Sequence, residues 1–235
     1  MTTTAPPAAD NRVAPFLLAV PFTATITGLF NLSDALPVPL AFAAGAGWGI
    51  VLGLAATWLT TKPVLSAWAE DVLVFLGIIA LAFAACGGVM SLLILNGALD
   101  SSSLTGETLA KAFLPMIPYY IAVNASLELL IIPGLLFLGW RAGERRILIV
   151  SAAALYFALR VWSYLAYVPA RLGFAESEHA TTALTAAERQ QAYIDLKLDD
   201  PRWILVLVIL SIFILAAGFP RVREVTAATS SGAAQ

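Results

Sequence analysis

Residues 71–97 of the chain read DVLVFLGIIALAFAACGGVMSLLILNG, and this stretch decides the fold class. After Asp71 it contains no charged residue, and it is longer than the roughly 20 residues that a helix needs to cross the hydrocarbon core of a bilayer. Peptide groups find no water in that core, so an apolar segment of this length must satisfy its hydrogen bonds as a helix. The stretch therefore predicts a transmembrane helix.

The rest of the chain repeats this pattern. Hydrophobic residues make up 60% of the 235 positions and charged residues 12%, about half the share found in soluble domains. The mean hydropathy of +0.87 excludes a soluble enzyme, and a net charge of -2 offers no basic surface for nucleic acid. We predict an all-α, polytopic integral membrane helix bundle in the lipid bilayer, with about six transmembrane helices at about 13–31, 38–60, 71–97, 113–140, 146–170 and 202–220.

The ends of the chain and its long connection are polar. Residues 1–12 and 224–235 read as disordered tails around a single domain at 13–223. The short basic turn at 141–146 favours an orientation with both termini in the cytoplasm, in the inner or plasma membrane of the cell. In the loop 171–201, the spacing of Thr185 and Glu188 predicts a short helix over about 186–197. We interpret the loop as a surface loop or as a lid over a site that opens outward.

Small residues recur every four positions in the second predicted span. Gly45, Gly49 and Gly53 lie on one helix face, where a partner backbone can approach closely. The third span repeats the spacing at Ala80, Ala84 and Gly88, so we expect it to be the partner. The alternative is a homodimer or a larger membrane complex formed through the same face.

Two charged residues lie inside the predicted spans, away from their ends. Glu128 precedes Trp140 by 12 residues and Arg160 follows Arg146 by 14, so both lie about 18–21 Å from the 141–146 turn. An isolated charge at mid-membrane costs at least about 2.5–3.5 kcal/mol. We therefore predict that Glu128 and Arg160 form an ion pair, with either a functional or a purely structural role.

Polar residues flank both members of this pair. Tyr120 and Asn124 share the helix face of Glu128, and Tyr156 and Tyr164 share that of Arg160. These six residues are our candidate ligand-binding site, in a hydrated cavity at mid-membrane. Tyr164 and Tyr167 could instead be anchors at the membrane interface.

Two further features bear on the cavity. Pro133 cannot donate to the carbonyl of Leu129, so we expect a kink beside Glu128 and a free acceptor. A stripe of Thr23, Thr27 and Asn31 on the first span is expected to complete the cavity wall.

The sequence argues against several cofactors. His179 is the only histidine and lies in the 171–201 loop, so no pair of histidines can hold a haem in the bundle. No cluster of His, Cys and acidic residues has metal-binding spacing. Every lysine lies outside the predicted spans, which excludes a buried Schiff base with retinal. We expect no cofactor and no metal.

These observations favour a multi-pass membrane protein that binds or transports a small or lipid-like molecule through the cavity around Glu128 and Arg160, with coupling to protons through the Glu128 carboxylate. One alternative is a membrane-embedded enzyme for a lipid-, quinone- or polyketide-like substrate, with Glu128 as acid and base. Another is an accessory subunit of a membrane complex.

Overall fold

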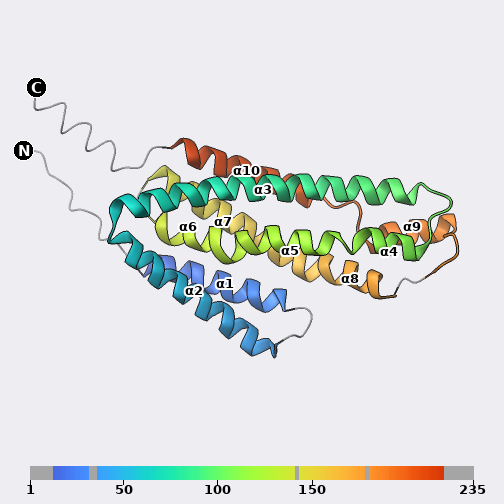
Figure 1. Ribbon diagram of the computed structural model, residues 1–235, viewed down its shortest axis with the longest axis horizontal. Coiled ribbons are helices and arrows are strands. Elements are labelled where there is room, and N and C mark those ends of the chain that lie inside the picture. Colours follow the sequence, from blue (N-terminus) through green and yellow to red (C-terminus); the bar gives the residue numbers. More distant parts are fainter. Residues whose placement is uncertain (1–12, 32–35, 141–142, 178–179, 220–235) are drawn as a thin grey trace, which may run out of the picture.

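The computed structural model describes residues 13–31, 36–140, 143–177 and 180–219, and its regular elements are all helices (Figure 1). The all-α prediction is confirmed. The predicted tails, residues 141 and 142 of the orientation-setting turn, and His179 lie outside these residues. The elements are α1 (Ala14–Phe30), α2 (Val38–Thr60), α3 (Pro63–Leu99), α4 (Gly106–Phe113), α5 (Met116–Ser126), η1 (Leu127–Ile131), α6 (Ile132–Leu138), α7 (Glu144–Trp162), η2 (Ser163–Tyr167), α8 (Val168–Ser177), α9 (Ala186–Asp195) and α10 (Arg202–Gly218), where η marks a π-helical turn.

Four helical segments are long and apolar enough to cross a membrane. They are Val38–Thr60, Pro63–Leu99, Gly106–Leu138 and Glu144–Glu176. The apolar helices α1 and α10 have 17 residues each and are shorter, so the count of six spans stays a prediction.

The third helix is longer than predicted. At 37 residues, α3 extends over about 55 Å, well beyond the apolar core of a bilayer. Its first two turns contain Glu70, which is buried and pairs with Arg145 (Oε1 to Nε, 2.9 Å). The apolar pattern of this span begins only after Glu70 and Asp71, so hydropathy places the start of the helix too late. The helix includes Glu70 because Arg145 pairs with its carboxylate.

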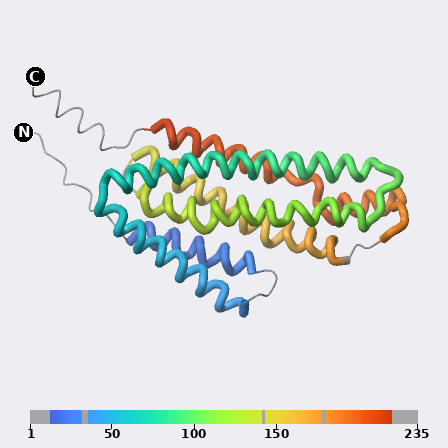
Figure 2. Tube along the Cα trace, viewed as in Figure 1, coloured from blue at the N-terminus to red at the C-terminus, as the bar shows by residue number. Residues whose placement is uncertain are grey.

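The helices form an elongated bundle with an end that α9 covers (Figures 1 and 2). The hairpin of α1 and α2 lies beside α6, and the end of α1 and the start of α2 both fall well short of the α9 end. α10 packs against α3 and α7. The α9 end is therefore built without the first two helices.

Two hydrophobic cores follow one another along the bundle. The larger contains apolar residues of α1, α3, α6, α7 and α10. The smaller lies at the α9 end, where Leu109, Leu184, Leu196 and Leu198 are buried against α3 and α8. The predicted helix in the 171–201 connection is confirmed as α9, with the capping box of Thr185 and Glu188 in place. This connection packs over the end of the bundle, since its leucines are in the smaller core.

The glycine face of α2 is packed, but against α1. A Cβ at Gly45 would stand 2.5 Å from the Thr23 carbonyl oxygen, and one at Gly49 would stand 3.0 Å from the Val20 Cα. The expectation that the third span is the partner was wrong; Gly88 of α3 instead faces Trp203 of α10. A homodimer through the α2 face stays a prediction, and it would require α1 to move away.

Candidate functional site

Glu128 and Arg160 form the predicted ion pair. The Arg160 Nε donates a hydrogen bond to Glu128 Oε1, and the Tyr164 hydroxyl donates to Oε2 at 3.0 Å. The Glu128 side chain is 3% exposed and that of Arg160 13%. Both carboxylate oxygens are therefore occupied by donors in a buried setting.

Of the other three candidate residues, two are hydrogen-bonded to each other and the third is bonded to α3. The Tyr156 hydroxyl donates to Asn124 Oδ1 at 3.2 Å. Tyr120 turns the other way, since its hydroxyl lies 2.6 Å from Ser91 Oγ and donates to the Gly87 carbonyl at 2.9 Å. The six residues singled out in the sequence thus lie in one region, but Tyr120 belongs to the α3 side of it.

Both helices that carry the pair widen into a π-helical turn at the site. η1 contains Glu128 and η2 contains Tyr164, and in each case a proline, Pro133 or Pro169, follows five positions later. A proline cannot donate to the carbonyl four residues before it, and single π turns are frequent at functional sites. The sequence predicted the disruption at Pro133 but not its π form.

The acceptor that Pro133 leaves free has found a donor. Trp48 of α2 donates its indole Nε1–H to the Leu129 carbonyl oxygen at 2.6 Å. This bond joins the glycine-rich helix to the wide turn that holds Glu128, so α2 supports the site from outside.

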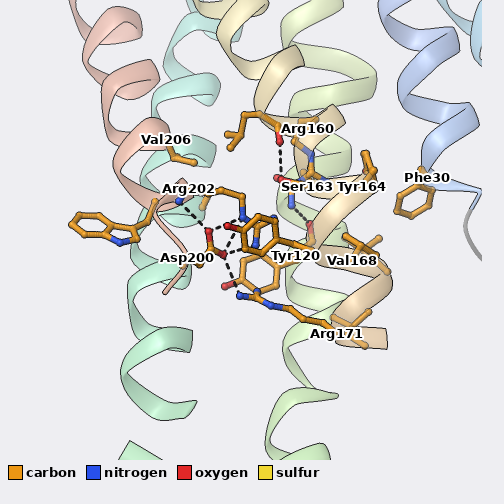
Figure 3. A pocket seen from close by; sticks show the side chains of 18 of the residues that line it. Phe30, Tyr120, Arg160, Ser163, Tyr164, Val168, Arg171, Asp200, Arg202 and Val206 are labelled. Atoms are coloured by element: carbon orange, nitrogen blue, oxygen red, sulfur yellow. Dashed lines mark hydrogen bonds and ion pairs between the residues drawn. The ribbon is translucent and has the colours of Figure 1, made fainter. Parts of the chain in front are cut away.

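A cavity of about 400 Å³ extends from this pair to Arg171, Asp200 and Arg202, on the side of the bundle that faces α9 (Figure 3). Five of the six candidates line it; Glu128 does not, because it lies behind Arg160 and Tyr164. The wall is mostly apolar. It is formed by Phe30, Ala84, Gly88, Leu92, Phe113, Ile117, Tyr120, Ile121, Asn124, Tyr156, Leu159, Arg160, Ser163, Tyr164, Tyr167, Val168, Arg171, Leu172, Asp200, Arg202, Trp203 and Val206.

A second charged cluster lies at the α9 end of the cavity. Asp200 sits between Arg171 and Arg202 (Figure 3). Arg171 Nη2 donates to Asp200 Oδ2 at 3.1 Å, and Arg202 Nε donates to Oδ1 at 2.8 Å. The backbone N–H of Arg202, the first residue of α10, also donates to Oδ1, at 3.0 Å, so Asp200 is bound to the start of this helix as well.

The charge state of Asp200 follows from these contacts. Burial alone would raise the pKa of its carboxyl, but the hydrogen bonds and the charge of Arg202 outweigh burial and hold the pKa below its usual value. Asp200 is therefore ionised at neutral pH, and the cluster of two guanidinium groups and one carboxylate carries one positive charge in excess.

The sequence alone did not predict this cluster, because Arg171 and Arg202 stand at the two borders of the 171–201 connection, where charged residues are ordinary. A signal was present: Arg160, Tyr164, Tyr167 and Arg171 are spaced four, three and four residues apart, which places them on one helix face. Tyr167 is buried, and its ring centroid lies 3.6 Å from Arg202 Cζ. It supports the cluster by a cation–π contact, and the reading of Tyr167 as a simple interfacial anchor was incomplete.

The threonine stripe of the first span does not line the cavity. Thr23 is fully buried beside Gly45 and Gly49, and its hydroxyl donates to the Ala19 carbonyl at 3.0 Å. Asn31 bonds instead to the backbone of Leu36. α1 contributes only Phe30 to the cavity wall; its ring packs edge-on against that of Tyr164, with the ring centroids 6.2 Å apart. The expectation of a third polar wall was wrong, because the threonines pack against the glycines of α2 and do not face the cavity.

Among the described residues, no group of three or more His, Cys, Asp or Glu side chains is placed to hold a metal ion. Comparisons with protein families, with curated proteins and with solved structures found no match. The chemistry of the cavity is therefore the basis for inferring a function.

Proposed function

We propose that this protein binds a small molecule in the cavity and transports it, with Arg160 as a polar contact and Glu128 as the residue that couples movement to protons. The observation that carries the proposal is the continuity of one cavity from the mid-bundle ion pair to the charged cluster at the α9 end. Its volume lies within the range of small-molecule sites, about 300–1,000 Å³, and its walls have the usual mixture of apolar surface with few polar groups.

The arrangement of the pair supports coupling. Glu128 is shielded from the cavity, while its two partners, Arg160 and Tyr164, both line it. A ligand that draws Arg160 toward the cavity leaves Glu128 without its counter-charge in a buried place, where a neutral carboxylic acid costs less than a carboxylate. Binding would then favour uptake of a proton.

The same geometry favours one alternative, a membrane-embedded enzyme for an apolar substrate. Tyr164 touches both the cavity and the Glu128 carboxylate, so its hydroxyl could pass a proton between them. We place either activity in the cell membrane with both termini cytoplasmic, on the basis of the predicted orientation.

A substrate screen followed by uptake separates these activities. Compounds that raise the unfolding temperature of the purified protein are tested for uptake into proteoliposomes with and without a proton gradient. We expect gradient-driven uptake by the wild type, loss of the gradient dependence in Glu128→Gln, and loss of binding in Arg160→Gln. Chemical conversion of the compound would support the enzyme, and a screen without any stabilising compound would contradict both.

A further inference from the structure

We infer that the ligand of this cavity is an amphiphile with one anionic group, a carboxylate or a phosphate, held between Arg171 and Arg202. This inference rests on the proposed function, since it names the class of molecule that the same cavity takes.

The first argument is the unbalanced charge at the α9 end. Arg171 and Arg202 share the single carboxylate of Asp200. The Nη1 group of each arginine makes no hydrogen bond to the described part of the chain, and both residues line the cavity. Guanidinium donors suit carboxylate and phosphate oxygens, so two sets of donors remain for an anion from the cavity.

The second argument is that the net charge of the cavity's ionised residues matches a single anionic group. Arg160 already has Glu128, and Arg171 and Arg202 share Asp200. The charges of the nearby Lys197 and Asp199 offset each other, so one positive charge is left in excess. A charge in a poorly hydrated place is unfavourable unless it is paired. A monoanion completes the balance, whereas a cation would meet like charge.

The third argument is the wall between the charged ends. Ala84, Ile121, Val168 and Val206 present apolar surface there. Arg160 and Arg171 are 11 residues apart on one helix, which is about 16 Å along its axis. A ligand with its head at Arg171 and Arg202 thus has room for an apolar body along these side chains.

Two sources share this chemistry, a free acidic amphiphile and a membrane phospholipid with an anionic headgroup. The probe is tritiated decanoate, bound to the purified full chain in a neutral detergent and measured by scintillation proximity. We expect competition by unlabelled decanoate and decyl phosphate, and none by decanol or decyltrimethylammonium at the same concentration. Competition by dihexanoyl phosphatidylglycerol but not by the choline analogue would identify a phospholipid as a ligand of the same class.

Variants test the assigned residues. Arg171→Gln and Arg202→Gln should each weaken decanoate binding about tenfold or more, as expected for loss of a charged hydrogen bond. Lys111→Gln, at an exposed position of α4 outside the cavity, is the control and should change nothing. Asp200→Asn should tighten binding, because it removes the carboxylate that competes with the ligand. Because this variant is expected to change the affinity for decanoate in the opposite direction, the inference stays testable if an arginine variant fails to fold.

Three results would overturn the inference. One is equal competition by decanol and decanoate, and another is weaker binding in Asp200→Asn. The third is that no decyl probe binds while the screen above finds a ligand of another class. In the first and third cases the cavity still binds a small molecule, so the proposed function would stand while the anionic class fails.

Discussion

The indole N–H of Trp48 donates to the carbonyl oxygen of Leu129, 81 positions along the chain, at 2.6 Å. Leu129 stands four residues before Pro133, so its carbonyl lacks the donor that an ordinary helix would supply. The carbonyl that Pro133 leaves without a donor in its own helix is therefore satisfied by a side chain of α2.

Trp48→Phe removes this donor and keeps an aromatic ring. We expect a loss of about 1–3 kcal/mol in the free energy of unfolding, because an acceptor in an apolar setting is left unsatisfied. Unfolding in detergent, followed by circular dichroism, measures it. Trp68→Phe, at a largely exposed position of α3, is the matched control; equal losses in both variants would show that the bond contributes nothing.

The α1–α2 interface can be tested with two glycines of one helix. A Cβ at Gly49 would lie 3.0 Å from the Val20 Cα and closer still to the Thr23 hydroxyl, whereas a Cβ at Gly47 meets no atom within 4 Å. Gly49→Leu should therefore cost about 1–3 kcal/mol or more through overpacking, and Gly47→Leu little. Monodisperse yield and unfolding temperature in detergent are the measurements. Similar values for both would place α1 away from this face.

The ion pair makes a prediction about three variants. Glu128→Gln or Arg160→Gln alone leaves a buried charge unpaired, which can cost about 3–5 kcal/mol, while the double variant leaves none. We expect each single change to lower the unfolding temperature more than the double change does. If the pair also serves the function, the double variant regains stability but stays inactive. A double variant that is less stable than both single variants would contradict the pairing.

The capping box of α9 predicts a dependence on acid. Hydrogen bonds from the Thr185 hydroxyl and backbone N–H to Glu188, at 2.7 Å each, lower the pKa of the Glu188 carboxyl in the folded protein. Its contribution is therefore complete above the ordinary glutamate pKa and is lost as the pH falls through the lowered one. Hydrogen-exchange protection of α9, corrected for intrinsic rates, should decline in that range. Glu188→Gln should show less protection at neutral pH and a flatter profile.

Topology is open to a direct test. With both termini cytoplasmic, a green fluorescent reporter fused after Gln235 should fluoresce and an alkaline phosphatase reporter there should be inactive. The reverse pattern would place the C-terminus outside, which contradicts the prediction that both termini are cytoplasmic around an even number of spans.

Hydropathy located the centres of the helices, because apolar length is what a bilayer selects. It did not locate their ends: α3 continues through Glu70 because Arg145 pairs with it, and the α9 end has its own buried leucines. Such contacts join residues far apart in sequence, and periodicity within one helix cannot reveal them.

The candidate site divides in the same way. Glu128 and Arg160 were predictable, since an isolated charge inside an apolar span needs a partner. The Arg171–Asp200–Arg202 cluster was not, because charges near the end of a span look like ordinary loop charges until a fold brings them over a cavity.

The small core under α9 also has a practical consequence for imaging. A 24.8-kDa membrane protein gives a particle whose detergent belt hides most features that could orient it. α9 is capped by Thr185 and followed by the fully buried Leu196, and its own surface is mainly polar. An antibody fragment raised against this helix would meet a fixed epitope, and would add the mass and the asymmetry needed to align single particles by electron cryo-microscopy.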